Sequence, residues 1–165
     1  MGGLRADQIV HPDLEGRWEG RAAPSSEWRF HRDIYRQRPE AQAVVHAHSP
    51  FAVSLACLRR GIPAFHYMVA VAGGTSVAPA TPPSAPRRSP TTCQLRWEDR
   101  RACHMANHEL VAFGETLDQV LAVALEVEGL CHQYWRAGLM GEPVLLSDAE
   151  MDEVLERFKT YGKRR

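Results

Sequence analysis

Helical and extended patterns alternate along this chain, and that alternation limits the folds open to it. Residues 24–39 begin with Pro-Ser-Ser-Glu, carry apolar side chains at helical spacing and stop at a proline, so they predict a capped amphipathic helix. The apolar run from Gln42 to His48 predicts a strand, and Ser49-Pro50 predicts the capped start of a second helix that ends at Gly61. The order in the first third of the chain is therefore helix, strand, helix.

The same alternation continues toward the C-terminus. The run from His66 to Ala72 predicts another buried strand, and residues 102–114 predict two short strands on either side of a turn. Thr116 can cap a long helix whose apolar side chains form one stripe, and the capping box at Ser147 begins the last helix. This order of elements predicts an α/β domain.

Residues 75–101 differ from the rest of the chain. Five of the eleven prolines and five arginines fall there without periodicity, so we expect an irregular insert. Because Glu98 and Asp99 offset part of the positive charge, we interpret this segment as a solvated loop rather than a basic binding patch.

The composition narrows the possible partners and location. The chain has 165 residues, 44% of them hydrophobic, and equal numbers of acidic and basic side chains, which suits one globular domain over residues 1–165. A net charge of zero favours neither nucleic acid nor an anionic membrane as a partner. Four cysteines without a CxxC pair predict reduced thiols. Without a signal-peptide pattern or an apolar run of membrane-spanning length, we expect a cytoplasmic location.

Two histidines, His46 and His48, flank a single alanine in the first predicted strand. On a strand both imidazoles point to the same side, which suits two ligands of one tetrahedral zinc ion, although ordinary half-buried histidines also form such pairs. His108 lies in the predicted turn, which can direct its side chain into the same cleft and complete a three-histidine site with an open coordination position. His104 is the alternative third ligand.

Glu27 lies early in the first predicted helix, directly after Ser25 and Ser26. Backbone N–H groups and the helix dipole favour anions at that end of a helix, so the two serines can bind a phosphate. Plain N-capping explains the same Ser-Ser-Glu sequence without any ligand. The residues alone leave both interpretations open.

Several blocks of the sequence match one known family. PSSEWRFH over residues 24–31 and AVVHAH over residues 43–48 are the most specific, and IPAFHYM over 62–68, ANH over 106–108 and FKTYG over 158–162 support them. These blocks resemble the class II aldolase/adducin family, in particular the branch that cleaves L-fuculose phosphate. The resemblance spans about residues 5–76 and 100–163.

The resemblance implies a three-layer α/β/α domain around a central, largely antiparallel sheet, usually assembled as a homotetramer. It implies that zinc is held by His46, His48 and His108, and that Glu27 beside the metal moves protons. It also implies that Ser25 and Ser26 bind the substrate phosphate and that Tyr161 donates a proton to the aldehyde oxygen.

The activity that the resemblance implies is retro-aldol cleavage of a sugar phosphate into a ketone phosphate and an aldehyde, with zinc as Lewis acid. Two alternatives remain: a non-catalytic or degraded member of the family, and an epimerase or dehydratase acting on a sugar phosphate. Glu27 and the Trp-Arg-Phe-His that follows it favour aldol cleavage over epimerisation.

Three features depart from the family pattern. The chain begins where family members are already well into the domain, so we expect half of the phosphate site to be missing. Residues 77–99 replace a segment that carries an active-site tyrosine, and a compensated frameshift is our hypothesis for them. Glu109 stands where a glycine normally follows the third histidine. If this position needs a positive φ, we expect Glu109 to be strained there, and its carboxylate can also approach the metal.

Overall fold

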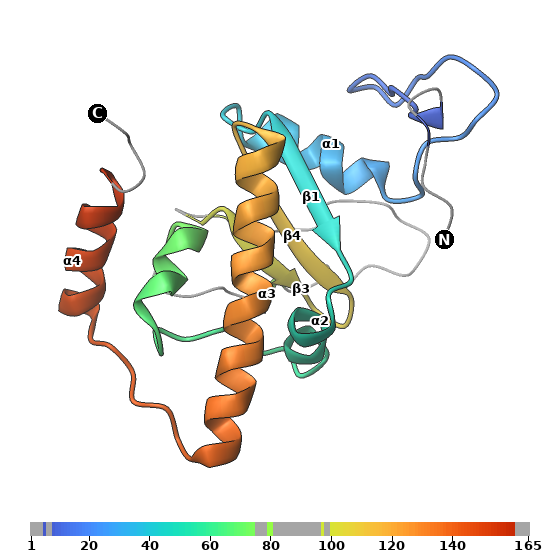
Figure 1. The fold of residues 1–165 in the computed structure, drawn as a ribbon. Helices are drawn as coiled ribbons and strands as arrows, with labels where there is room; N and C mark the ends of the chain where they lie inside the picture. Colours follow the sequence, from blue (N-terminus) through green and yellow to red (C-terminus); the bar gives the residue numbers. More distant parts are fainter. Residues whose placement is uncertain (1–4, 6–7, 75–78, 81–96, 98–99, 161–165) are drawn as a thin grey trace.

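The computed structural model describes residues 5, 8–74, 79–80, 97 and 100–160 (Figure 1). Its elements are, in chain order, helix α1 (Trp28–Gln37), strand β1 (Ala43–Ala47), helix α2 (Pro50–Cys57), 3₁₀ helix η2 (Tyr67–Ala72), strands β2 (Pro79–Ala80), β3 (Ala102–Met105) and β4 (Glu109–Gly114), and helices α3 (Leu117–Met140) and α4 (Asp148–Phe158).

The strands form one four-stranded sheet in the order β1-β4-β3-β2. Strand β4 runs antiparallel to both of its neighbours, with Ala43 opposite Gly114 and Cys103 opposite Val111. Strand β2 pairs with β3 in parallel. The sheet is therefore largely antiparallel, as the resemblance implied.

Helices cover both faces of this sheet (Figure 1). Along β4, Leu110 and Ala112 pack in the larger core cluster with α3, whereas Val111 and Phe113 pack with Ile34 of α1. Successive side chains of a strand point to opposite faces, so α1 and α3 lie on opposite sides. The result is the expected three-layer α/β/α arrangement.

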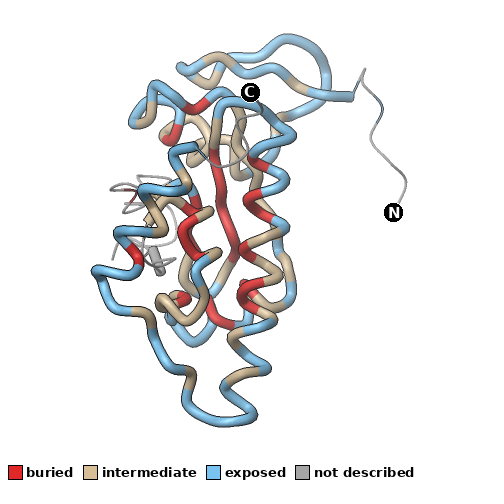
Figure 2. The backbone as a smooth tube through the Cα atoms, turned by 60° about the vertical axis from the view of Figure 1, so that its left-hand side comes forward, coloured by how far each residue is buried: buried red, intermediate tan, exposed pale blue. Residues whose placement is uncertain are grey.

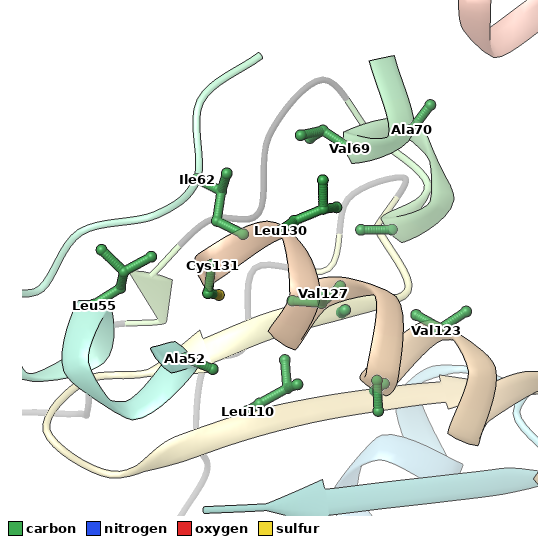
Figure 3. Close-up of a cluster of buried hydrophobic side chains, with 14 of the residues drawn as sticks. Ala52, Leu55, Ile62, Val69, Ala70, Leu110, Val123, Val127, Leu130 and Cys131 are labelled. Atoms are coloured by element: carbon green, nitrogen blue, oxygen red, sulfur yellow. The ribbon is translucent and has the colours of Figure 1, made fainter. Parts of the chain in front are cut away.

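The larger core lies between the sheet and α3 (Figure 3). Figure 2 shows that buried stretches concentrate on the strands and on parts of the helices that pack against them. Leu130 of α3 is fully buried in this cluster, so replacing it with alanine would cost roughly 2–5 kcal/mol of unfolding free energy. Among the helices that the structure describes, none combines the length and apolar character needed to cross a membrane.

Most of the predicted elements are confirmed. The first helix begins at Trp28, later than predicted, with Glu27 as its N-cap residue. The N–H of Glu27 donates to Ser25 Oγ at 3.3 Å, and the N–H of Trp28 donates to the carbonyl oxygen of Ser25 at 3.1 Å. The two serines therefore belong to a turn that precedes the helix. The caps predicted at Thr116 and Ser147 are both present.

The strand predicted from His66 to Ala72 is wrong, because this run forms the 3₁₀ helix η2. His66 Nδ1 accepts a hydrogen bond of 3.2 Å from the N–H of Met68, and Gly73 ends the helix with φ of 92°. A short apolar run is buried equally well as a strand or as a compact helix, and its periodicity does not distinguish them.

The predicted irregular insert lies mostly outside the described residues. Its described parts are ordered differently from the prediction: Pro79 pairs with His104 of β3, and Trp97 is 3% exposed. The Trp97 ring packs edge-on against Phe113, with 4.8 Å between the ring centroids. Trp97 therefore belongs to the smaller core beneath α1 rather than to a solvated loop.

Candidate metal centre

Strand β1 places His46 on the sheet face that α1 covers. Val44 packs in the core cluster with α1 and Val45 in the cluster with α3, so the period of two puts His46 on the side of Val44. His48 follows one residue after the strand, and its side chain is 59% exposed, against 18% for His46. The two imidazole centroids are 4.9 Å apart.

The turn between β3 and β4 brings His108 to the same place. Asn107 has φ of 58°, a left-handed conformation that asparagine tolerates. Its N–H donates to the carbonyl oxygen of Ala56 at 3.0 Å, and its Nδ2 donates to the carbonyl oxygen of Cys57 at 3.3 Å. The end of α2 thus holds the turn, and the ring of His108 lies 5.1 Å from that of His48.

Glu27, the N-cap residue of α1, contacts the histidines from the helix layer that covers this face of the sheet. Its Oε2 is 3.2 Å from Nδ1 of His46, and its Oε1 is 3.0 Å from Nε2 of His108. One carboxylate therefore contacts a histidine of strand β1 and a histidine of the turn between β3 and β4. The side chain keeps 26% of its surface exposed, so it remains accessible to a bound molecule.

Glu109, the first residue of β4, is fully buried in the middle of the cluster. Its Oε2 is 3.4 Å from Nε2 of His48 and 3.5 Å from Nε2 of His108, and it also contacts Nε2 of His46. The positive φ expected for this residue is absent: in the described chain, Asn107 and Arg59 are the non-glycine residues with positive φ. Because Asn107 takes up the sharp turn, Glu109 fits without that strain.

Burial governs the charges in this cluster. Burial raises the pKa of Glu109 to about 8, and repulsion from the Glu27 carboxylate contributes to the rise. Burial also lowers the pKa of His46, which the Glu27 carboxylate opposes and the neighbouring histidines reinforce. The His46 imidazole is therefore held in the neutral form, which is the form that binds a metal ion.

The donor atoms of the cluster fit one metal ion. One donor atom from each residue lies within 4.8 Å of all the others. Within the described part of the chain, Nε2 of His46 and both carboxylate oxygens of Glu109 are buried without a hydrogen-bond partner, which a bound cation would remedy. Imidazole nitrogens and carboxylate oxygens suit zinc and other divalent transition metals. The five residues are Glu27, His46, His48, His108 and Glu109.

His104, the alternative third ligand, lies on the opposite face of the sheet. It is fully buried, with Nε2 3.5 Å from Sγ of Cys131 and Nδ1 3.5 Å from the carbonyl oxygen of Arg60. Burial lowers its pKa to about 4. Its place on the α3 side separates it from the other histidines, so it is not a ligand in the same cluster.

The serines predicted to bind phosphate lie next to the cluster but outside it. Ser25 and Ser26 are exposed in the turn before α1, directly ahead of Glu27. Tyr161, the predicted proton donor, lies outside the described residues.

A cleft of about 650 Å³ separates residues 8–14 from α1. Its wall includes Ser25, Trp28 and His31, and the ring centroid of His31 is 6.2 Å from that of His46. The cleft therefore adjoins the histidine cluster. His31 comes four residues after Glu27, and this spacing is the sequence signal that puts it on the side of the helix facing the cluster.

Comparison with known proteins gives a consistent result. A family model described as class II aldolase and adducin N-terminal domain matches residues 1–135. A 5-methylthioribulose-1-phosphate/5-deoxyribulose-1-phosphate aldolase of Rhodospirillum rubrum is 50% identical over 162 residues, which cover 96% of this chain and 72% of that protein. An L-fuculose phosphate aldolase of Escherichia coli is 42% identical over 168 residues, covering 98% and 76%.

The fold has a counterpart among solved structures. A structure of an L-fuculose 1-phosphate aldolase superposes with a TM-score of 0.81 at 37% sequence identity. The superposition covers 94% of this chain and 74% of that protein. Both the sequence and the fold therefore point to the same group of proteins.

Proposed function

This chain belongs to the class II aldolase and adducin family and, within it, to the aldolases, and on that premise we propose that it cleaves a ketose 1-phosphate by retro-aldol chemistry. The products would be a ketone phosphate and an aldehyde. The named relatives act on 1-phosphates of fucose- and ribose-derived ketoses, which supports this substrate class. An L-fuculose-phosphate-like sugar is the substrate that the resemblance favours.

The observation that carries the proposal is the contact of one carboxylate with two of three converging histidines. His46, His48 and His108 would hold the metal ion, for which zinc is our proposal. When bound, such an ion supplies Lewis acidity to the substrate carbonyl. Glu27 stands 3.2 Å from His46 and 3.0 Å from His108, so its carboxylate is placed to take up and return a proton beside the metal site.

The other proposed roles belong to groups around the cluster. Ser25 and Ser26 are exposed beside the N-terminus of α1, where the helix dipole favours the substrate phosphate. We assign the donation of a proton to the aldehyde oxygen to Tyr161. Both assignments extend the resemblance to residues of this chain and are testable by substitution.

The homotetramer is also part of the proposal, and an apolar stripe on α3 supports it. Leu117, Leu121 and Leu125 follow one another at intervals of four residues and are 48–65% exposed. Contact with another copy of the chain would cover them. Light scattering of the purified protein would test this, and a monomer at micromolar concentration would contradict it. The cytoplasmic location remains a prediction.

The decisive assay is cleavage of L-fuculose 1-phosphate and 5-deoxyribulose 1-phosphate by metal-loaded protein, followed by detection of the ketone phosphate. We expect cleavage that disappears with a chelator and returns with a divalent metal. An epimerised or dehydrated product would favour the alternative reactions of the family. If metal-loaded, folded protein converted none of these sugars, the non-catalytic alternative would replace our proposal.

A further inference from the structure

The buried carboxylate of Glu109 points to a metal site with more protein ligands than the three histidines. We propose that Glu109 is itself a ligand of the ion, an inference that rests on the metal site of the proposed function. The glycine that normally follows the third histidine in the family would supply no donor atom at this position. The proposed role therefore depends on the glutamate of this chain.

The distances of Glu109 from His48 and His108 fit shared coordination of one ion. Ligand atoms that surround one tetrahedral zinc, each about 2.0–2.1 Å from it, stand roughly 3.3–3.4 Å apart. Oε2 of Glu109 is 3.4 Å from Nε2 of His48 and 3.5 Å from Nε2 of His108, close to that separation. The same oxygen contacts Nε2 of His46, so it faces one nitrogen of every histidine in the cluster.

The burial of Glu109 also favours a bound cation. Its side chain has 0% exposure, and neither carboxylate oxygen has a hydrogen-bond partner among the described residues. An isolated carboxylate buried in this way is costly unless a cation or hydrogen-bond donors compensate it. The residues around it are three histidines and a second carboxylate, so a divalent cation satisfies them all together.

The backbone fixes this position. Strand β4 pairs with β1 so that Ala47 lies opposite Leu110, and continuing that register by one residue places His48 opposite Glu109. Val111 and Phe113, on the same side of β4 as Glu109, pack in the core beneath α1. The side chain of Glu109 therefore cannot leave the cluster without turning the strand over.

A fourth protein donor changes what the site can do. Catalytic zinc sites keep a coordination position open for substrate, whereas closed sites are structural. Two carboxylates would also neutralise the charge of a divalent ion. We therefore expect Glu109 to hold the ion more tightly and to compete with the substrate for it.

The test is a titration of the full chain with Co²⁺ and with Zn²⁺ against a chelator, comparing wild type with Glu109→Gln and Glu109→Gly. The glutamine variant keeps the size of the side chain, and the glycine variant removes every donor atom. Glu115→Gln, in the exposed residue just after the far end of β4, controls for the loss of one negative charge away from the cluster. Circular dichroism establishes that each variant is folded.

We expect both Glu109 variants to bind metal at least ~10-fold more weakly, since even outer-shell partners of metal ligands contribute 10–100-fold. The visible absorption bands of bound Co²⁺ should shift in both, whereas Glu115→Gln should match wild type. Unchanged affinity and Co²⁺ bands in the folded Glu109 variants, with binding still lost in His46→Ala, would overturn the role of Glu109 alone. Absence of metal from wild type would overturn the metal site of the proposed function as well.

Discussion

The carboxylate of Glu128, in α3, accepts a hydrogen bond of 2.9 Å from the backbone N–H of Phe51 in the first turn of α2. Its second oxygen accepts another of 2.8 Å from the N–H of Ala52. Ser49, the predicted cap of α2, makes no side-chain capping hydrogen bond. Helix α2 follows the strand that carries His46. It is therefore capped by a residue 77 positions away in the sequence.

Replacing Glu128 with alanine should lower the free energy of unfolding by roughly 2–4 kcal/mol, because two charge-assisted hydrogen bonds are lost and two N–H groups are left unpaired. Urea unfolding followed by circular dichroism measures the change. The exposed Glu142 offers a matched control, and Glu142→Ala should unfold at the wild-type urea concentration. Equal midpoints for all three proteins would show that the Glu128 cap contributes nothing to stability.

Stability should also fall in acid because of His104. Its folded pKa of about 4 is below the ordinary value of 6.5, so the unfolded chain takes up the proton first as the pH decreases. Above pH 6.5, His104 takes no free energy of unfolding away. As the pH falls below 6.5 the free energy of unfolding decreases progressively, and the decrease is complete at about pH 4. At pH 5 the loss should be roughly 2 kcal/mol, at about 1.4 kcal/mol per unit.

The variant His104→Gln isolates this effect, because it stays polar but does not titrate. Unfolding free energies of both proteins at pH 7.5 and pH 5 give the comparison, in which acid effects from other groups are common to both. We expect the loss between the two pH values to be smaller in the variant. The same loss in both proteins would mean that His104 is not the group responsible.

Short-range signals predicted the parts of the fold that depend on neighbouring residues. The Ser147 capping box, the Thr116 cap and the strand around His46 all have patterns contained within a few positions. The cap of α2 could not be predicted in this way, since Glu128 comes from a distant helix. The 3₁₀ helix after His66 was missed for a related reason: only its packing partners decide between two ways of burying the same apolar run.

In the candidate site, too, local patterns could be predicted and contacts between distant residues could not. The pattern of His46 and His48 on a strand indicated one shared face. The register of β3 and β4 puts His104 opposite Leu110, on the side of α3, whereas His108 lies in the turn between the two strands. Glu109 was noticed as an unusual residue, but its full burial and its contact with every histidine depend on the pairing of β1 with β4. The resemblance supplied the role of Tyr161, which lies outside the described residues.

The carboxylate of Glu27 should be needed for turnover. At saturating metal, Glu27→Gln should reduce kcat by about 10²–10⁴-fold, the usual contribution of a general acid or base. Steady-state kinetics with a ketose 1-phosphate measures this, and Glu19→Gln, in an exposed residue of the preceding segment, should retain wild-type kcat. A kcat within twofold of wild type for Glu27→Gln would exclude proton transfer by this residue.

Tyr161→Phe removes one hydroxyl group and tests the proposed proton donor. We expect kcat to fall by about 10²-fold or more, with metal content unchanged, because the tyrosine would act on the leaving aldehyde and not on the ion. A loss in metal content together with kcat would instead indicate a structural role for the C-terminal residues. An unchanged kcat would remove Tyr161 from the mechanism.

The most direct test of the account is the metal content of the purified protein after dialysis, measured for wild type, His108→Ala and the control His11→Ala, whose histidine is exposed and outside the cluster. We predict close to one divalent ion per chain in wild type and in His11→Ala, and little in His108→Ala. Wild-type protein without metal, or equal metal in all three proteins, would contradict a metal centre built from His46, His48 and His108.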